Sequence, residues 1–585
     1  MEEWEEWPKL VEGEEPEEDG GQFPCLRELI IINCPKLRMF SHHLPRLLEM
    51  LIDICDSLRE LPQLLPSLRW LRISKCPKLV VLPSIQSIEI LNLNNCNQIT
   101  TLFDSDQPSS SSSSLMFNSN HLSSSSLMSD SDHPSSFSSS VPAAAAAPHV
   151  HNSIIFPSLR DLEIVCCPNL RELTDILPSL ESLRIENCKE LCVLPMLPSI
   201  KEFSLGECKG MVLNNKIVPH LSSLSSLTIY DVSDLKSLPN EFMQHLTALQ
   251  ELRIYHCKEL MVLLQFEIGF GHLLPSSLQH LSIYDCDNLG KLPQSMCNLH
   301  CLKELIIEGA RGLTSLPDGL HNLSPLRILQ ISNCENLESL PKVLHTLTSL
   351  QEFVIESCPS LMSFQQTTLP SALQELKIID CKNLESLPMG LLPNLTSLQS
   401  LVLHGYLNLK SLPEELHKLM SLQRLEIKEC PALESISDMG LPTALRDLVI
   451  INCGKLNSLP KGLHKLTNIK LLVIMECSFL MDCKNLEPLH TSGLHNLTSL
   501  SSLTIGRCRV LMSIPKGLLP TNLGGFSIKD CPILESLHEG LSHLTSLKLL
   551  EIQNCPMLKQ RYQKREEEWA KIAQIPKVII DHKRQ

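Results

Sequence analysis

The chain has 585 residues, of which 43% are hydrophobic and only 4% aromatic, so we expect a folded protein with an aliphatic core. The formal net charge is −15, and residues 1–19 supply −9 of it, which leaves the rest of the chain nearly balanced. No broad basic surface is available for a phosphate backbone, so the composition argues against nucleic-acid binding. No apolar run reaches 18 residues, which argues against membrane insertion by a spanning helix.

The first segment, residues 1–22, is acidic and has Trp4 and Trp7 among its few large apolar residues. It lacks the apolar stretch of a secretory signal, so we expect a cytoplasmic, or alternatively nuclear, protein whose 24 cysteines stay reduced. Such a segment is a poor cover for an apolar edge. The sequence therefore predicts that the chain is a fragment, or a truncated relative, of a longer protein.

From residue 23 onward the chain repeats the pattern Leu-x-x-Leu-x-Ile-x-x-Cys-x-x-Leu, and we call the position of its cysteine the anchor. Eighteen of the 21 anchors are cysteines, and the other three are Val232, Ala310 and Tyr406. The anchors are residues 34, 55, 76, 96, 167, 188, 208, 232, 257, 286, 310, 334, 358, 381, 406, 430, 453, 477, 508, 531 and 555. Because chance does not give such regularity, we interpret the chain as an array of structural repeats.

The spacing within each repeat predicts its shape. Apolar residues five and three positions before the anchor alternate with polar ones, which is typical of a short strand with one buried face. One repeat cannot bury its own apolar stripe, so neighbouring repeats must stack. We therefore predict an α/β repeat fold, a leucine-rich repeat solenoid shaped like a horseshoe, with a parallel concave sheet and an irregular or short-helical convex side. At roughly 4.8 Å per strand, the sheet measures about 95 Å along its arc.

The repeats are interrupted once and end in a different segment. The step from anchor 96 to anchor 167 holds about 50 extra residues, rich in serine, which we expect to form a disordered insertion. After the last repeat we expect a helix at Glu566–Ala573 and a strand at Lys577–Ile580 that covers the final repeat. The predicted organisation is an acidic lead segment (1–22), repeats 1–4 (23–103), the insertion (104–153), repeats 5–21 (154–558) and a C-terminal cap (559–585).

The concave sheet is the candidate binding surface. We expect the side chains two and one residues before each anchor, and the one between the two strand apolars, to project from it. Three consecutive repeats place tyrosines there, in the pairs Tyr230-Asp231, Tyr255-His256 and Tyr284-Asp285. Exposed aromatic residues are favoured anchors of protein interfaces, although the rings could also merely stack on one another. The full set of candidates is Tyr230, Asp231, Arg253, Tyr255, His256, Tyr284, Asp285, Trp70, Arg72 and Lys75.

The motif search finds no catalytic residues and predicts no cofactor. No Gly-x-Ser-x-Gly, His-Glu-x-x-His or paired Cys-x-x-Cys motif occurs in the chain, so we predict a protein that is not an enzyme. Cys297 and Cys301 have the spacing of half a zinc site, but no second pair lies nearby. We expect both cysteines to pack in the core, and we predict no metal site.

The repeats resemble the leucine-rich repeat region of plant intracellular immune receptors of the nucleotide-binding type, especially the coiled-coil class. The likeness rests on the cysteine-anchored pattern with Leu-Pro, as in residues 183–195, on Trp4-Glu5-Glu6-Trp7, and on the closing residues 568–576. The phosphate-binding motif Gly-x-x-x-x-Gly-Lys-Ser/Thr of the complete receptors is absent from this chain.

The resemblance implies a non-catalytic module of plant innate immunity that binds a protein through its concave face. The implied partner is a pathogen effector, a guarded host protein, or the nucleotide-binding domain of a receptor that the repeats hold inactive. The alternative is a free-standing leucine-rich repeat scaffold or inhibitor.

Overall fold

The structure is a computed structural model that describes most of residues 23–584. The acidic lead segment (1–22), the serine-rich insertion (104–153) and Gln585 lie outside the described residues. The gaps are residues 41–42, 103–155, 174–175, 215–220, 265–273, 343, 363–367, 385–386, 388–391, 393, 438, 461, 479–485, 487–488, 490–492, 538–540, 542 and 565–571.

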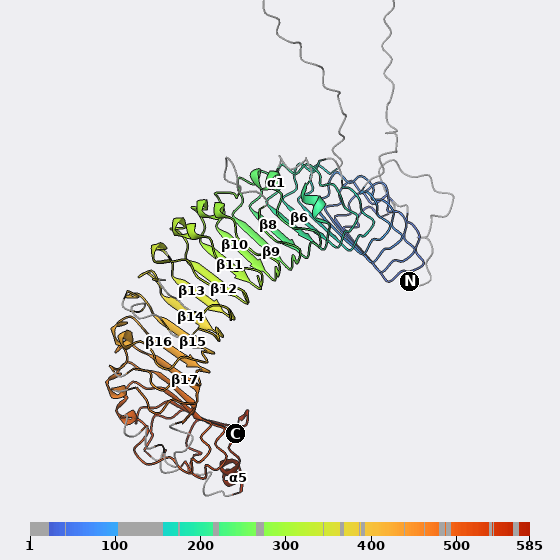
Figure 1. Cartoon of the computed structure of the whole chain (residues 1–585). Coiled ribbons are helices and arrows are strands. Elements are labelled where there is room, and N and C mark those ends of the chain that lie inside the picture. Colours follow the sequence, from blue (N-terminus) through green and yellow to red (C-terminus); the bar gives the residue numbers. More distant parts are fainter. Residues whose placement is uncertain are drawn as a thin grey trace, which may run out of the picture.

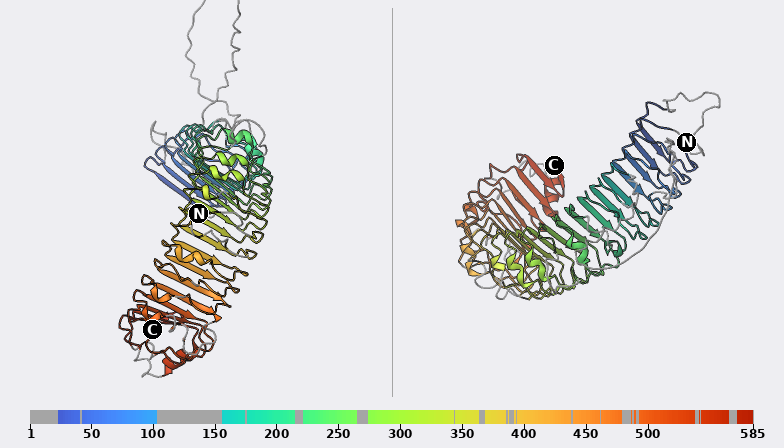
Figure 2. Two further views of the ribbon diagram at one scale, coloured as in Figure 1. Left: turned by 60° about the vertical axis from the view of Figure 1, so that its left-hand side comes forward. Right: turned by 90° about the horizontal axis from the view of Figure 1, so that it is seen from above.

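Each of the 21 repeats contributes one strand, as the sequence predicts. The strands pair in parallel and in chain order, so that residues at the same place in the repeat face one another across neighbouring strands. They are β1 (Glu28–Ile32), β2 (Glu49–Asp53), β3 (Trp70–Ser74), β4 (Ile90–Asn94), β5 (Asp161–Val165), β6 (Ser182–Glu186), β7 (Glu202–Gly206), β8 (Ser226–Tyr230), β9 (Glu251–Tyr255), β10 (His280–Tyr284), β11 (Glu304–Glu308), β12 (Ile328–Ser332), β13 (Glu352–Glu356), β14 (Glu375–Ile379), β15 (Ser400–His404), β16 (Arg424–Lys428), β17 (Asp447–Cys453), β18 (Leu471–Cys477), β19 (Ser502–Gly506), β20 (Gly525–Lys529) and β21 (Leu549–Gln553). Figure 1 shows these strands lining the inner side of an arc, and the other views in Figure 2 show one continuous row.

The fold class is thus confirmed as a leucine-rich repeat solenoid. The insertion does not interrupt the sheet, because Ile90 of β4 is the register partner of Asp161 of β5. Short helices lie on the convex side after β7, and within the described residues none occurs between β1 and β7. These helices are η1 (Gly210–Asn214), α1 (Asn240–Gln244), η3 (Gln294–Asn298), η4 (Asp318–Asn322), η5 (Leu344–Thr346), η6 (Glu414–Lys418), η7 (Leu463–Lys465) and η8 (Leu494–Asn496).

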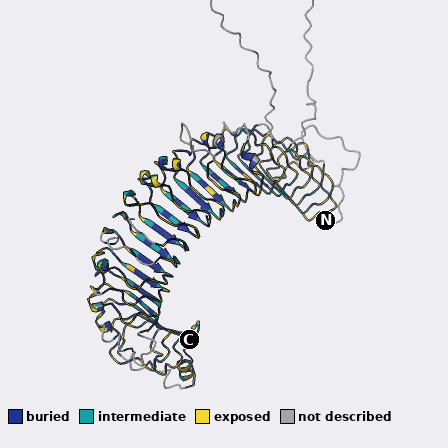
Figure 3. Cartoon of the chain, viewed as in Figure 1, coloured by how far each residue is buried: buried dark blue, intermediate teal, exposed yellow. Residues whose placement is uncertain are grey.

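The core is a single aliphatic column that runs the length of the array. In β2–β21 the second and fourth residues of every strand are buried, and so is every anchor. The buried residues form one continuous cluster from Ile31 to Ile580, which Figure 3 shows as a dark band along the arc. Burial of apolar area stabilises a fold by about 25 cal/mol per Å². A single repeat buries too little apolar area to be stable alone, and stacking on its neighbours provides the additional burial.

The anchor cysteines are part of this column. Seventeen of the thiols donate a hydrogen bond to the carbonyl oxygen two residues earlier, with donor–acceptor distances of 3.2–3.7 Å. Burial raises the pKa of Cys208 and Cys453 to about 11 and that of Cys430 and Cys477 to about 12. None of the described cysteines forms a disulfide. In these seventeen repeats the thiol therefore acts as a small buried donor near the end of the strand.

The C-terminal segment closes the array with one more strand. β22 (Lys577–Ile580) pairs in parallel with β21, and β23 (Lys583–Arg584) pairs with β22 in the antiparallel direction. The helix α5 comes earlier than the sequence predicts, at Pro556–Lys564, directly after the last anchor. Most of the predicted helix, residues 566–571, lies outside the described residues.

A left-handed residue lies one position before each anchor, directly after the strand in most repeats and within β17 and β18 in two of them. The backbone φ there is positive in all 21 repeats, for example +53° at His256 and +50° at Asp285. Asparagine and aspartate tolerate this conformation because their short side chains bond locally, whereas a β-branched residue is strained by its Cβ substituents. Ile54, with φ of +55°, is the β-branched residue in this row.

We expect Ile54→Asn to raise the free energy of unfolding by about 0.5–1 kcal/mol, because asparagine relieves this backbone strain. The measurement is urea-induced unfolding followed by circular dichroism. Ile32→Asn is the matched control, since Ile32 is 49% exposed on the neighbouring strand β1 and carries no positive φ. A stability of Ile54→Asn equal to or below that of the control contradicts the strain.

Candidate concave-face binding site

The concave surface is formed by the first, third and fifth residues of each strand, because the second and fourth point into the core. This placement corrects one part of the sequence interpretation. The residue just before the anchor leaves the sheet through its left-handed turn. Asp231, His256, Asp285 and Lys75 therefore lie exposed on the rim beyond the carboxyl ends of their strands.

Two of the three predicted tyrosines form the centre of this surface. Tyr255 of β9 and Tyr284 of β10 are register partners, and their rings stack with centroids 4.8 Å apart and planes inclined by 5°. Both rings are half-buried. Burial and the neighbouring Tyr255 raise the pKa of Tyr284. We call Tyr255 and Tyr284 the tyrosine pair.

Tyr230, the third tyrosine, lies differently. Its ring covers Gly206 of β7, since a Cβ placed on that glycine would lie 1.9 Å from Cζ of the tyrosine. Glycine leaves this space open, and the ring fills it. Burial and the nearby Glu186 carboxylate raise the pKa of Tyr230. The predicted row of three aromatic rings is therefore a stacked pair with a third ring turned toward β6 and β7.

The charged candidates beside the tyrosine pair already have partners. Arg253 projects from the middle of β9, and its guanidinium lies 2.5 Å from Oε1 of Glu251 on the same strand. On the rim, His256 Nδ1 lies 3.4 Å from Asp285 Oδ2. These contacts pair the charged side chains beside the rings, and surface pairs of this kind contribute only about 0–1 kcal/mol to stability.

The candidates of the early arm do not join this centre. Trp70 and Arg72 lie on the concave face of β3, and Lys75 follows on its rim. Arg72 and Lys75 are exposed, whereas Trp70 is half-buried. Five strands separate β3 from β9 in the sheet. Trp70, Arg72 and Lys75 therefore form a second group that is separate from the tyrosine pair.

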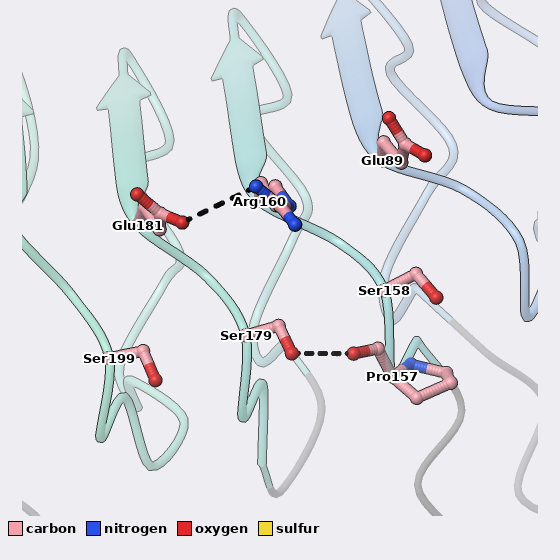
Figure 4. A pocket seen from close by; sticks show the side chains of 7 residues that line it. All are labelled: Glu89, Pro157, Ser158, Arg160, Ser179, Glu181 and Ser199. Carbon is pink, nitrogen blue, oxygen red and sulfur yellow. Dashed lines mark hydrogen bonds and ion pairs between the residues drawn. The ribbon is translucent and has the colours of Figure 1, made fainter.

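Hydrogen-bonded serines line the opposite rim, at the amino ends of the strands, and the sequence analysis missed them. Ser179 Oγ donates to the Pro157 carbonyl at 2.7 Å, and Ser199 Oγ donates to the Pro178 carbonyl at 2.6 Å. The recurring Pro-Ser that precedes the strand leucines was the available signal. Figure 4 shows this rim, where a hollow of about 410 Å³ also contains the ion pair of Arg160 with Glu181.

The carboxyl rim carries a larger hollow of about 730 Å³ that runs from Asp285 to Glu429. Arg311, which lines it, lies 3.6 Å from Asp287 and 3.2 Å from Glu335. Arg311 is thus held by charges of its own rim. We regard this hollow as the groove between successive left-handed turns.

The described part of the chain contains neither a candidate metal site nor a candidate membrane-spanning helix. No group of three or more histidine, cysteine, aspartate or glutamate side chains there is placed to hold a metal ion. Cys297 is buried, but Cys301 is exposed in the turn before β11, so the prediction that it packs in the core is wrong. None of the described helices combines the length and apolar character needed to cross a bilayer.

Comparison with known proteins gives one family match. A family model of the leucine-rich repeats of RPS2-like plant disease resistance proteins matches residues 144–287, which include both rings of the tyrosine pair. No curated protein sequence matches the chain significantly.

Several solved structures are similar to this chain. A leucine-rich repeat protein of Leptospira interrogans has a TM-score of 0.44 and 22% identity, covering 66% of this chain and 90% of its own. YopM from Yersinia enterocolitica has a TM-score of 0.40 and 19% identity, covering 88% and 91%. TLR13, in a complex with ssRNA13, has a TM-score of 0.44 and 16% identity, covering 89% and 75%.

Proposed function

We propose that this chain is a non-catalytic protein-recognition module of plant innate immunity that binds its partner through the concave face. The partner would be a pathogen effector, a guarded host protein or the nucleotide-binding domain of a receptor. The match of residues 144–287 to plant resistance repeats supports the biological setting. The observation that carries the proposal is the tyrosine pair on an open sheet.

The physical argument starts from the rigidity of the array. Neighbouring strands share one register and one core, so the concave side chains form a fixed surface rather than a loop that must be ordered on binding. Tyrosine combines a large apolar area with a polar tip and has few rotatable bonds, so it is favoured at interface centres. Stacked rings on adjacent strands present such an area without further ordering cost.

We expect the double variant Tyr255→Ala/Tyr284→Ala to weaken binding of the partner by at least about tenfold, because truncated interface anchors commonly cost 2 kcal/mol or more. The partner would be captured by co-expressing the full chain in leaf tissue with secreted pathogen proteins. Its affinity would then be measured by biolayer interferometry.

His321→Ala on the convex helix η4 is the control and should leave the affinity unchanged, because His321 is exposed on the opposite side of the array. Equal losses from the control and from the double variant would contradict concave-face recognition.

A further inference from the structure

Charge is distributed unevenly along the concave sheet. The first, third and fifth residues of β5–β14, which we call the acidic face, include ten carboxylates, only three arginine or lysine side chains, and His280. The corresponding positions of β1–β4 hold three carboxylates and one arginine, and those of β15–β21 hold three of each sign. The largest excess of negative charge therefore lies in the middle of the sheet, β1–β4 carry a smaller excess, and β15–β21 are balanced.

The three arginine and lysine side chains of the acidic face are held by carboxylates of the same face, and His280 Nδ1 lies 2.9 Å from Glu304 Oε2. Arg184 contacts Glu186 at 2.7 Å, and Lys377 contacts Glu352 and Glu375 at 3.2 Å. Arg253 is held by Glu251, as described above. No base of this face therefore remains available for an acidic partner.

Four carboxylates of the acidic face have no basic partner among the described residues: Asp161, Glu202, Glu308 and Glu356. Burial, Glu163 and Glu202 raise the pKa of Asp161, as expected where like charges gather. A ligand that supplies positive charge would relieve this repulsion, and a negative one would increase it.

Two of these four carboxylates continue the row of the tyrosine pair. Glu308 of β11 is the register partner of Tyr284, and Glu356 of β13 follows it beyond Ser332 of β12. Ser332 is only 2% exposed and accepts a hydrogen bond from Gln330 Nε2 at 3.3 Å, so Glu308 and Glu356 are the charged side chains of this row beyond the tyrosine pair. An aromatic ring face thus lies beside carboxylates whose charge is not balanced.

A ring face beside a carboxylate distinguishes a guanidinium from an ammonium group. A guanidinium is planar, stacks on aromatic rings and donates paired hydrogen bonds to a carboxylate. An ammonium is a compact, strongly hydrated charge that gains less from a flat ring beside one carboxylate. The site therefore favours arginine over lysine.

We propose that the acidic face binds a basic segment of the protein partner, with an arginine side chain of that segment against Tyr284 and Glu308. This inference rests on the proposed function and names the chemistry of the partner at the same surface. The remaining unpartnered carboxylates attract further basic residues of the segment.

The test uses the full chain and two fluorescein-labelled peptides, octa-arginine and octa-lysine, in fluorescence anisotropy titrations at several salt concentrations. Octa-arginine should bind more tightly than octa-lysine. Glu308→Gln/Glu356→Gln should weaken octa-arginine binding by about tenfold, because two charge-assisted contacts are lost. Tyr284→Leu should remove most of the preference for arginine, because it removes the ring face but no charge.

Asp447→Asn is the matched control, since it removes a carboxylate from the concave face of β17, outside the acidic face. Its affinity should stay within about twofold of the unaltered chain, because a single distant surface charge is screened at physiological salt. Hydrogen exchange in the presence of octa-arginine should show protection in β9–β13.

The inference is overturned if octa-arginine does not bind, or if the double glutamine variant binds it as tightly as the unaltered chain. Protection confined to the late strands β17–β21 also overturns it, while leaving concave-face recognition intact. The proposed function has its own test: it is contradicted if the affinity of the captured partner is unchanged by Tyr255→Ala/Tyr284→Ala.

Discussion

The protein should lose stability steeply above about pH 9, because several of its buried anchor thiols ionise less readily in the folded chain than in the unfolded one. The pKa of Cys208 and Cys453 is raised to about 11, and that of Cys430 and Cys477 to about 12, in each case mainly by burial. In the unfolded chain a thiol titrates near 8.5. Above that pH the unfolded state binds fewer protons than the folded state, so its free energy falls relative to the folded one.

The expected slope is large because the contributions add. Each such thiol lowers the free energy of unfolding by about 1.4 kcal/mol per pH unit between its unfolded and folded pKa values. Four thiols give about 5 kcal/mol per pH unit between about pH 9.5 and 11, and no such effect below about pH 8. Urea midpoints measured by circular dichroism from pH 7 to 10.5, under reducing conditions, would show this decline.

A matched variant separates the thiols from lysines and tyrosines that titrate in the same range. Cys430→Val/Cys453→Ala should fold, because valine and alanine occupy the anchor in the repeats of Val232 and Ala310. Its slope above pH 9 should be smaller by about 2.7 kcal/mol per pH unit. An unchanged slope would show that the anchor thiols are not responsible for the alkaline loss.

Tyr406 should give the largest single-residue effects on stability, in opposite directions for two substitutions. It occupies an anchor, is fully buried, and has a buried hydroxyl without a hydrogen-bond partner among the described residues. Tyr406→Ala should lower the free energy of unfolding by about 3–5 kcal/mol, because it leaves a cavity in a close-packed column. Tyr406→Phe should raise it by about 1–2 kcal/mol, because it removes a buried polar group that gains no bond.

Urea unfolding of both variants measures these changes, and hydrogen exchange in β14–β16 shows whether they are local to the repeat. Tyr284→Phe is the control, because it removes a hydroxyl from a half-buried ring on the concave face and should change stability by less than about 0.5 kcal/mol. A clear loss of stability in Tyr406→Phe would mean that the buried hydroxyl is satisfied in solution.

The sequence predicted the architecture because each repeat has the same pattern of apolar residues and must bury the same face. Alternating residues such as Leu183 and Ile185 specify a strand with one buried face, and identical neighbours specify parallel stacking. Each anchor cysteine is buried in the column that this stacking forms. The insertion between β4 and β5 did not disturb this interpretation, since the pattern resumes in the same register.

The candidate site was only partly accessible to the same reasoning. The sequence places Tyr255 and Tyr284 at one position of adjacent strands, and their stacking follows from the strand spacing. The sequence could not predict the position of Tyr230, whose ring occupies the space that Gly206 leaves open. It also assigned Asp231 and Asp285 to the sheet, because periodicity alone does not show that the chain turns left-handed one residue before the anchor.

What the sequence by itself determined is the set of properties that repeat along the chain: the strand, the buried positions and the order of the array. Only the tertiary structure decided the properties that depend on differences between neighbouring repeats, namely the position of each ring, the serine bonds along the rim and the unbalanced charge of the acidic face. The physical reason is distance along the chain. Backbone periodicity acts within a few residues, whereas packing and charge act between side chains that lie 20 or more residues apart in sequence and about 5 Å apart in space.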